Sequence, residues 1–154
     1  MSIFRFRLAT LLRLRHAERD ERRSDLEQSL SAADTLRRQR QALNAEQDDN
    51  VRLLRRLAGP GSGNVGSLLQ AHHFGTVLKA RNRRLAQQEA QAEQEIERRR
   101  LLLVEADQQV RVLEKLAERQ AAEHQRRADK LELRRLDEVA SVSYLRAHRA
   151  QEGS

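Results

Sequence analysis

The C-terminal half of the chain carries a regular hydrophobic pattern. From residue 85 to residue 120, positions that alternate four and three residues apart are apolar in eight of eleven cases when alanine is included. A heptad of this kind predicts a helix that pairs with a second helix along one stripe. The positions are Leu85, Glu89, Ala92, Ile96, Arg99, Leu103, Ala106, Val110, Leu113, Ala117 and Gln120.

The N-terminal half has a poorer pattern. No single heptad phase joins its leucines, so we expect stutters in a thin and marginally stable seam. The leucines are Leu8, Leu11, Leu12, Leu14, Leu26, Leu30, Leu36, Leu43, Leu54 and Leu57.

One segment interrupts the helical pattern. Four of the six glycines and the only proline lie between residues 59 and 66. Gly59 stands where a glycine ends a helix, and Pro60 cannot continue one. Ser67 and Gln70 have the spacing of a capping box at the start of the next helix. The sequence therefore predicts helices over about residues 5–57 and 68–149, joined by a linker over residues 58–67.

At ~1.5 Å per residue, these helices would be roughly 80 Å and 120 Å long. A short linker favours an antiparallel pair. We therefore predict an all-α fold, a long antiparallel two-helix coiled-coil hairpin with unequal helices, forming a single coiled-coil domain over residues 1–154. Facing residues should have numbers that add up to about 125.

The second helix should then extend beyond the first. Residues after about 125 have no counterpart in the first helix, yet large apolar residues continue there. An apolar stripe without a partner in its own chain is a candidate docking surface. Its apolar members are Leu131, Leu133, Leu136, Val139, Val142 and Leu145.

Composition supports a helical, soluble protein. Charged residues make up 34% and aromatic residues only 3%, which suits a coiled coil better than a globular core. The absence of cysteine excludes disulfides, cysteine-based zinc sites and a thiol nucleophile, and it fits a reducing compartment. No stretch has the apolar length of a signal peptide or a membrane span, so we expect a cytoplasmic protein.

The net charge of +7 is concentrated in one part of the chain. Residues 37–84 hold ten basic and three acidic groups, and the remainder is neutral. Such a segment is compatible with nucleic-acid binding. It has almost no aromatic residues for base stacking and no known groove-reading motif, which argues against that reading.

The sequence offers no catalytic chemistry. Adjacent His72 and His73 would diverge by about 100° on a helix, so we interpret them as surface residues, as we do His16, His124 and His148. The carboxylates should be solvated, many of them in i,i+4 pairs. The glycines of the linker lack the Lys-Ser/Thr of a phosphate-binding loop. We expect no enzyme activity, no catalytic residues, no cofactor and no metal. The i,i+4 pairs include Asp34–Arg38, Glu95–Arg99 and Glu123–Arg127.

Three motifs near the two ends carry a resemblance. They are Phe6-Arg7-Leu8-Ala9-Thr10-Leu11-Leu12-Arg13-Leu14-Arg15, Leu113-Glu114-Lys115-Leu116-Ala117-Glu118-Arg119-Gln120 and Leu136-Asp137-Glu138-Val139-Ala140. Together with the position of the break and the unequal helices, they resemble the flagellar type III export protein FliJ family. This family is related to the YscO-type secretion stalk proteins, and the resemblance covers nearly the whole chain.

The resemblance implies a role as well as a fold. Family members are antiparallel coiled coils that act as a non-enzymatic stalk or adaptor. The implied partners are the hexameric flagellar export ATPase, a membrane protein of the export gate, and export chaperones. The implied location is cytoplasmic and peripheral, at the cytoplasmic face of the inner membrane. No small-molecule substrate and no nucleic acid are expected.

The resemblance also implies two partner-binding surfaces. The gate-binding surface would comprise Leu43, Phe74, Leu78 and Leu85, with polar Glu46 and Asn50 where larger apolar groups are expected. The ATPase-binding surface would comprise Leu12, Arg15, Leu116, Arg119, Leu136, Asp137 and Glu138. The alternative function is a basic coiled-coil scaffold or a nucleic-acid-binding protein.

Overall fold

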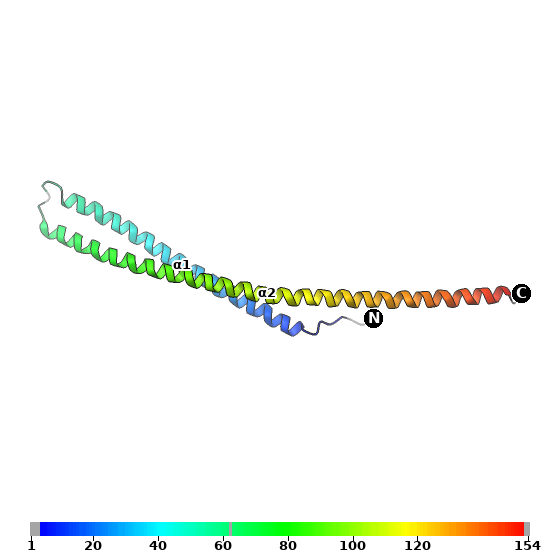
Figure 1. Cartoon of the computed structure of the whole chain (residues 1–154). Helices are drawn as coiled ribbons and strands as arrows, with labels where there is room; N and C mark the ends of the chain where they lie inside the picture. Colours follow the sequence, from blue (N-terminus) through cyan, green and yellow to red (C-terminus); the bar gives the residue numbers. More distant parts are fainter. Residues whose placement is uncertain (1–3, 62, 153–154) are drawn as a thin grey trace. The chain divides into compact units, whose positions relative to one another are not determined.

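The chain folds into two long α-helices. The computed structural model describes residues 4–61 and 63–152, and in this part of the chain α1 spans Ala9–Leu57 and α2 spans Val65–Glu152 (Figure 1). The two helices pack against each other, and the described residues include no strand. The prediction of an all-α hairpin with unequal helices is confirmed.

The start of α1 lies four residues later than the sequence suggested. The amide of Ala9 donates to the carbonyl of Phe6 at 3.2 Å, and the first helical bond runs from Leu12 to Leu8 at 2.9 Å. The residue that precedes the helix is Leu8, whose side chain cannot accept a hydrogen bond from the first free amides. Residues 5–8 therefore stay outside the helix despite their helical pattern.

The residues that form the turn and start α2 differ from those that the sequence suggested. The amide of Gly59 donates to the carbonyl of Arg56 at 3.3 Å and closes the last turn of α1. The left-handed backbone lies further on, at Gly61, where φ is 91°. The predicted cap at Ser67 is wrong, because Asn64 Oδ1 accepts from the amide of Ser67 at 3.3 Å and α2 begins at Val65. Asparagine is among the best N-cap residues, so it starts the helix one turn earlier.

Two compact units make up the chain. We call Glu18–Ala106, which contains the linker, the tip unit. We call Met1–Ala17 with Asp107–Ser154 the terminal unit. The single domain over residues 1–154 stays a prediction.

Within the tip unit, the predicted stripe of α2 faces α1. Its positions from residue 85 to residue 106 are all buried or half-buried, and the same spacing extends back to Leu78 and Ala71. Leu78 is fully buried and Ile96 is 6% exposed. The heptad of the C-terminal half is confirmed as the contact stripe, which we call the seam.

The stutters expected in α1 are absent. One unbroken phase of alternating three- and four-residue steps runs from Leu12 to Leu57, and every position on it is buried or half-buried. Half of these positions are polar, and several leucines, including Leu14 at 62% exposed and Leu30 at 43%, lie off the seam. A search for apolar residues alone therefore missed the phase. The polar members are Arg15, Arg19, Arg22, Ser29, Arg40, Gln47 and Asn50.

The predicted register of the hairpin is confirmed in the tip unit. Side-chain contacts between α1 and α2 join residues whose numbers add up to between 121 and 130, close to the expected value of about 125. An example is Arg99, whose Nη1 donates to the carbonyl of Asp25 at 2.6 Å.

The terminal unit pairs the first turns of α1 with the middle of α2. His16 Nε2 lies 3.4 Å from Glu114 Oε1, and the rings of Phe4 and His124 are 5.7 Å apart between centroids. Val110 is 1% exposed. His16 and His124 are half-buried in this pairing, and the side chain of His16 is still 35% exposed, so they are surface residues that also contact the facing helix.

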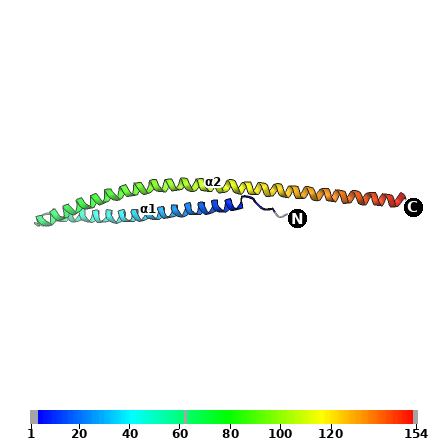
Figure 2. The ribbon, with the colours of Figure 1, turned by 90° about the horizontal axis from the view of Figure 1, so that it is seen from below.

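Beyond this pairing, α2 continues alone. All described side chains from residue 125 to residue 149 are exposed, and Figure 2 shows the orange-to-red end of α2 extending past the first turns of α1. The prediction of an unpaired extension is confirmed. We call residues 125–149 the overhang.

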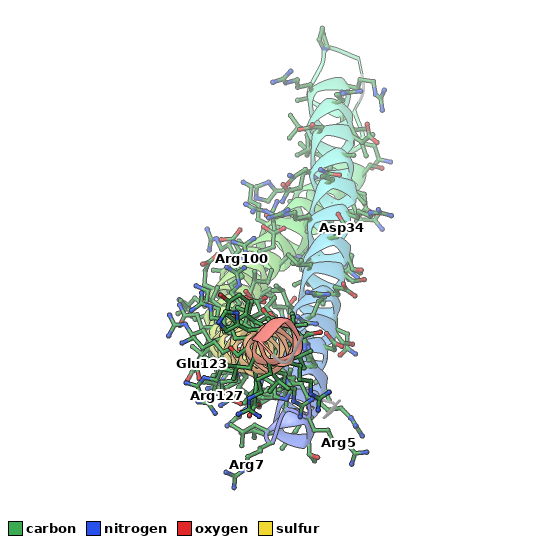
Figure 3. All side chains as sticks on the ribbon, turned by 90° about the vertical axis from the view of Figure 1, so that its right-hand side faces the viewer. Arg5, Arg7, Asp34, Arg100, Glu123 and Arg127 are labelled. Carbon is green, nitrogen blue, oxygen red and sulfur yellow. The ribbon has the colours of Figure 1, made fainter. Side chains whose placement is uncertain are left out.

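Most charged side chains point away from the helix axes, as Figure 3 shows for Asp34, Arg100 and Arg127. The predicted i,i+4 pairs form, with Asp34–Arg38 at 2.9 Å, Glu95–Arg99 at 2.7 Å and Glu123–Arg127 at 3.8 Å. Exposed pairs of this kind each stabilise a helix by only about 0.2–0.5 kcal/mol.

Candidate partner-binding surfaces

The four residues of the implied gate-binding surface fall into two groups. Leu43 is 7% exposed and Leu78 is fully buried, because both occupy seam positions. Leu85 is half-buried, also on the seam. Phe74 is 46% exposed and is the member that presents a large apolar surface to solvent.

Two open grooves run beside the seam at these residues. One, of about 590 Å³, is lined by Leu53 and Leu57 of α1 and by Phe74 and Val77 of α2. The other, of about 410 Å³, lies between Leu43, Glu46 and Leu85 and carries Arg81 and Arg84 on its rim. Exposed Glu46 lines the second groove, and Asn50, which is 6% exposed in the seam, lines the first.

The burial of Asn50 depends on a glycine in the facing helix. Its Nδ2 donates to the carbonyl of Ala71 at 3.1 Å, and its Oδ1 is buried with no partner among the described residues. A Cβ on Gly75 would lie 2.7 Å from that Nδ2, so any side chain at position 75 would displace the amide. Gly75 thus lets α2 approach the asparagine closely.

A polar cluster follows one turn further along the seam. Asn82 Nδ2 donates to Asn44 Oδ1 at 2.5 Å and to Gln47 Oε1 at 3.0 Å. Arg40 donates from Nε to Asn82 Oδ1 at 3.2 Å and from Nη1 to Glu89 Oε2 at 2.7 Å. The side chain of Glu89 is only 16% exposed, so the expectation that the carboxylates are solvated is wrong at this position. Polar groups at seam positions fix which residues face each other.

A second polar layer is built around Arg99. Its Nε and the Nη2 of Arg98 both donate to Glu95 Oε1, at 2.7 Å and 2.8 Å. The hydrogen bond from Arg98, followed by the one from Arg99, lowers the pKa of Glu95 below 4.5 and raises the pKa of Arg98. Only Arg99 also reaches the opposite helix, at the carbonyl of Asp25.

The implied ATPase-binding residues lie on both parts of the terminal unit. Leu12, Arg15 and Leu116 are half-buried, and Arg119 is exposed. All four lie in the terminal unit, on the first turns of α1 and the middle of α2.

The other three members lie on the overhang. Leu136, Asp137 and Glu138 are exposed, with Leu136 at 60%. Further large apolar residues surround them, and these are 44–71% exposed. They are Leu131, Leu133, Val139, Val142, Tyr144 and Leu145. Tyr144, whose ring stacks on His148 at 6.1 Å, was missed because it does not continue the leucine and valine pattern.

Sequence reasoning also missed two residues at the tip. Val65 is 68% exposed and Leu69 is 64% exposed, in the first turns of α2. The signal was available, because a cap at Asn64 makes both residues helical and places them on one face, four residues apart.

The described residues contain no cluster of His, Cys, Asp or Glu that could hold a metal ion. His72 and His73 are both exposed. Among the described helices, none has the length and apolar character needed to cross a membrane.

Comparison with known proteins gives one result. Neither the curated proteins nor the solved structures yielded a match to this chain. The model of the family described as the flagellar FliJ protein matches residues 4–149, which include both helices almost entirely. The chain therefore belongs to the FliJ family and is a non-catalytic component of the flagellar protein export apparatus.

Proposed function

We propose that this chain is the stalk and adaptor of the flagellar export apparatus, which binds the hexameric export ATPase and connects it with the export gate and the export chaperones. The proposal rests mainly on the exposed apolar side chains of the overhang. At least six large apolar side chains are more than half exposed there, on a helix with no second helix beside it. Burying such a side chain contributes about 1.5–3 kcal/mol, so a partner that surrounds the overhang would gain substantially.

The ring of a hexameric ATPase suits this surface. The apolar residues of the overhang are spread around the helix rather than on one stripe, because Leu131 points more than 100° away from both Leu133 and Leu136. A flat partner would cover only one of these directions. A central opening would contact the helix on several sides.

A pull-down with the export ATPase from the same genome tests the proposal. The full chain should retain the ATPase, and replacing Leu136 and Val139 with aspartate should abolish retention. The matched control replaces Val104 and Val112, which are also more than half exposed but precede the overhang. Retention that is lost equally in the control, or an ATPase that never binds, would refute the proposed contact.

We further propose that the linker end of the tip unit faces the gate. Support comes from exposed Phe74, from the groove that it lines with Leu53, and from the basic residues nearby. Charge reversal at Arg81, Arg83 and Arg84 should weaken association with the gate and leave ATPase binding intact. If the reversal abolishes ATPase binding instead, the orientation is wrong. This arrangement would place the protein in the cytoplasm, peripheral to the inner membrane.

The alternative is a basic scaffold that binds nucleic acid. The concentration of the +7 net charge in residues 37–84 favours it. Its test is binding to duplex DNA across a range of salt concentrations, because phosphate contacts make affinity fall steeply as salt rises. Tight binding with a steep salt dependence, together with failure of the ATPase pull-down, would favour this alternative.

A further inference from the structure

The tip unit carries a region without any acidic residue. Between residues 50 and 84, the sequence has seven basic side chains and no Asp or Glu. All seven basic side chains are exposed, and one of them, Arg52, forms an ion pair with Asp49 at 3.6 Å. Arg55 and Arg56 stand in the last turn of α1, where a cation offsets the negative end of the helix dipole. That role does not explain the basic residues at 79–84, which lie more than three turns inside α2.

Apolar side chains are exposed in the same region. Val65 and Leu69 are each more than 60% exposed, and Val51 is 44% exposed. Packing within the chain gives no reason for a large apolar residue at these positions, since polar residues would be equally helical and better solvated. The combination of cations and exposed apolar groups is the notable feature of this end.

The two kinds of side chain share one face of α2. At 100° per residue, Val65, Leu69, Thr76, Lys79 and Arg83 fall within an arc of about 80°. All five are exposed. The apolar pair lies at the start of the helix and the cations follow about three to five turns later. We call this face of α2 the tip face.

We propose that the tip face binds the surface of an anionic lipid bilayer. The cations would lie among the acidic headgroups, while Val65 and Leu69 would enter the boundary between headgroups and acyl chains. Long Lys and Arg side chains suit this position because their stems lie along apolar surface while their charges stay in the polar layer. The contact requires neither the ATPase nor the gate protein, so it goes beyond the proposed function.

Nucleic acid fits the tip face less well. Between residues 50 and 84 the only aromatic ring besides the two histidines is that of Phe74, which is too few for base stacking. Phosphate contacts would use the cations, but they would leave Val65 and Leu69 without a role. A bilayer uses both kinds of side chain.

Flotation of the full chain with lipid vesicles tests the proposal. Vesicles of phosphatidylglycerol mixed with phosphatidylcholine should bind the protein, and vesicles of pure phosphatidylcholine should not. Each cation near an anionic surface changes the affinity by about fivefold, so Lys79→Gln with Arg83→Gln should weaken binding by roughly an order of magnitude or more. Leu69→Gln should weaken it by about fivefold at unchanged charge.

Control variants on the overhang test whether vesicle binding depends on the tip face or on charged and apolar side chains anywhere in the chain. Arg134→Gln with Arg135→Gln removes the same charge from the overhang, and Leu133→Gln replaces a leucine that is 61% exposed there. Both controls should bind vesicles like the unmodified chain, and circular dichroism should show equal helicity in all variants. The proposal is overturned if anionic vesicles do not bind, or if the controls weaken binding as much as the tip variants. It is also overturned if the tip variants lose affinity for duplex DNA but not for vesicles.

Discussion

Polar residues decide much of how the two helices face each other. Arg40, Asn50, Asn82 and Arg99 all occupy seam positions, where a simple coiled coil would have leucine or valine. Each has a hydrogen-bonding partner on the other helix. A sequence pattern of apolar residues misses such positions, which is why α1 was predicted to have stutters although its phase is unbroken.

The close contact between Asn50 and Gly75 predicts the effect of replacing Gly75 with alanine. Alanine in a helix interior is normally more stable than glycine by about 0.5–1 kcal/mol. Gly75→Ala should instead destabilise the protein by about 1 kcal/mol, because the new Cβ displaces an amide that is hydrogen-bonded in the seam. Urea unfolding followed by circular dichroism measures the free energy.

The same substitution serves as its own control in a second background. With Asn50→Ala already present, the obstacle is gone, and Gly75→Ala should then stabilise the protein by about 0.5–1 kcal/mol. An effect of equal sign in both backgrounds would show that the two side chains do not meet as the structure has them.

Arg98 and Arg99 provide a second comparison at single residues. Both donate to Glu95, but only Arg99 reaches across to Asp25. Arg99→Ala should lower the free energy of unfolding by about 1–2 kcal/mol, through the lost charge-assisted bond and the lost packing of its stem. Arg98→Ala, at an exposed position, should lower the free energy of unfolding clearly less than Arg99→Ala does. Equal effects of the two substitutions in thermal or urea unfolding would show that the interhelical bond of Arg99 does not contribute to stability.

The helices themselves could be predicted from the sequence to within a few residues. The break around Pro60 was clear, since glycine and proline cluster nowhere else. The first residue of α2 was not, because Asn64 and Ser67 are both good caps and only the folded backbone decides between them. Periodicity predicts where helices are, whereas competing caps make their ends uncertain.

The pairing of the terminal unit can be tested by crosslinking. Leu12 and Leu113 are both half-buried, and the register predicted from the sequence places them opposite each other. Cysteines at these two positions should form a disulfide within one chain under mild oxidation, and the natural sequence contributes no competing thiol. Non-reducing electrophoresis with and without a protease site in the linker distinguishes this product from a dimer.

A neighbouring position provides the control for the crosslink. Val112 precedes Leu113 but is 66% exposed, so its side chain points away from α1. Cysteines at Leu12 and Val112 should crosslink slowly or not at all. Crosslinks that form only between chains at Leu12 and Leu113 would contradict the pairing.

At the scale of the whole chain, charge and apolar surface are distributed unevenly. The excess positive charge lies in residues 37–84, in the middle of the sequence. The exposed apolar residues of the overhang lie near its C-terminal end. The sequence showed both features directly. It could not show that Leu43 and Leu78, expected to contact a partner, are buried in the seam, because a stripe that packs inward and a stripe that binds outward have the same periodicity.

The overhang gives the prediction that bears most directly on the proposed function. Because every described side chain from residue 125 to residue 149 is exposed, a chain that ends after Arg127 loses no buried side chain. The truncated protein should keep the unfolding midpoint of the full chain in circular dichroism. It should lose stimulation of the export ATPase, since the apolar residues proposed to enter the ring are absent. Val139→Asp with Val142→Asp in the full chain should reproduce this loss without shortening the helix. A truncated protein that stimulates the ATPase fully would exclude the overhang as the ATPase-binding element.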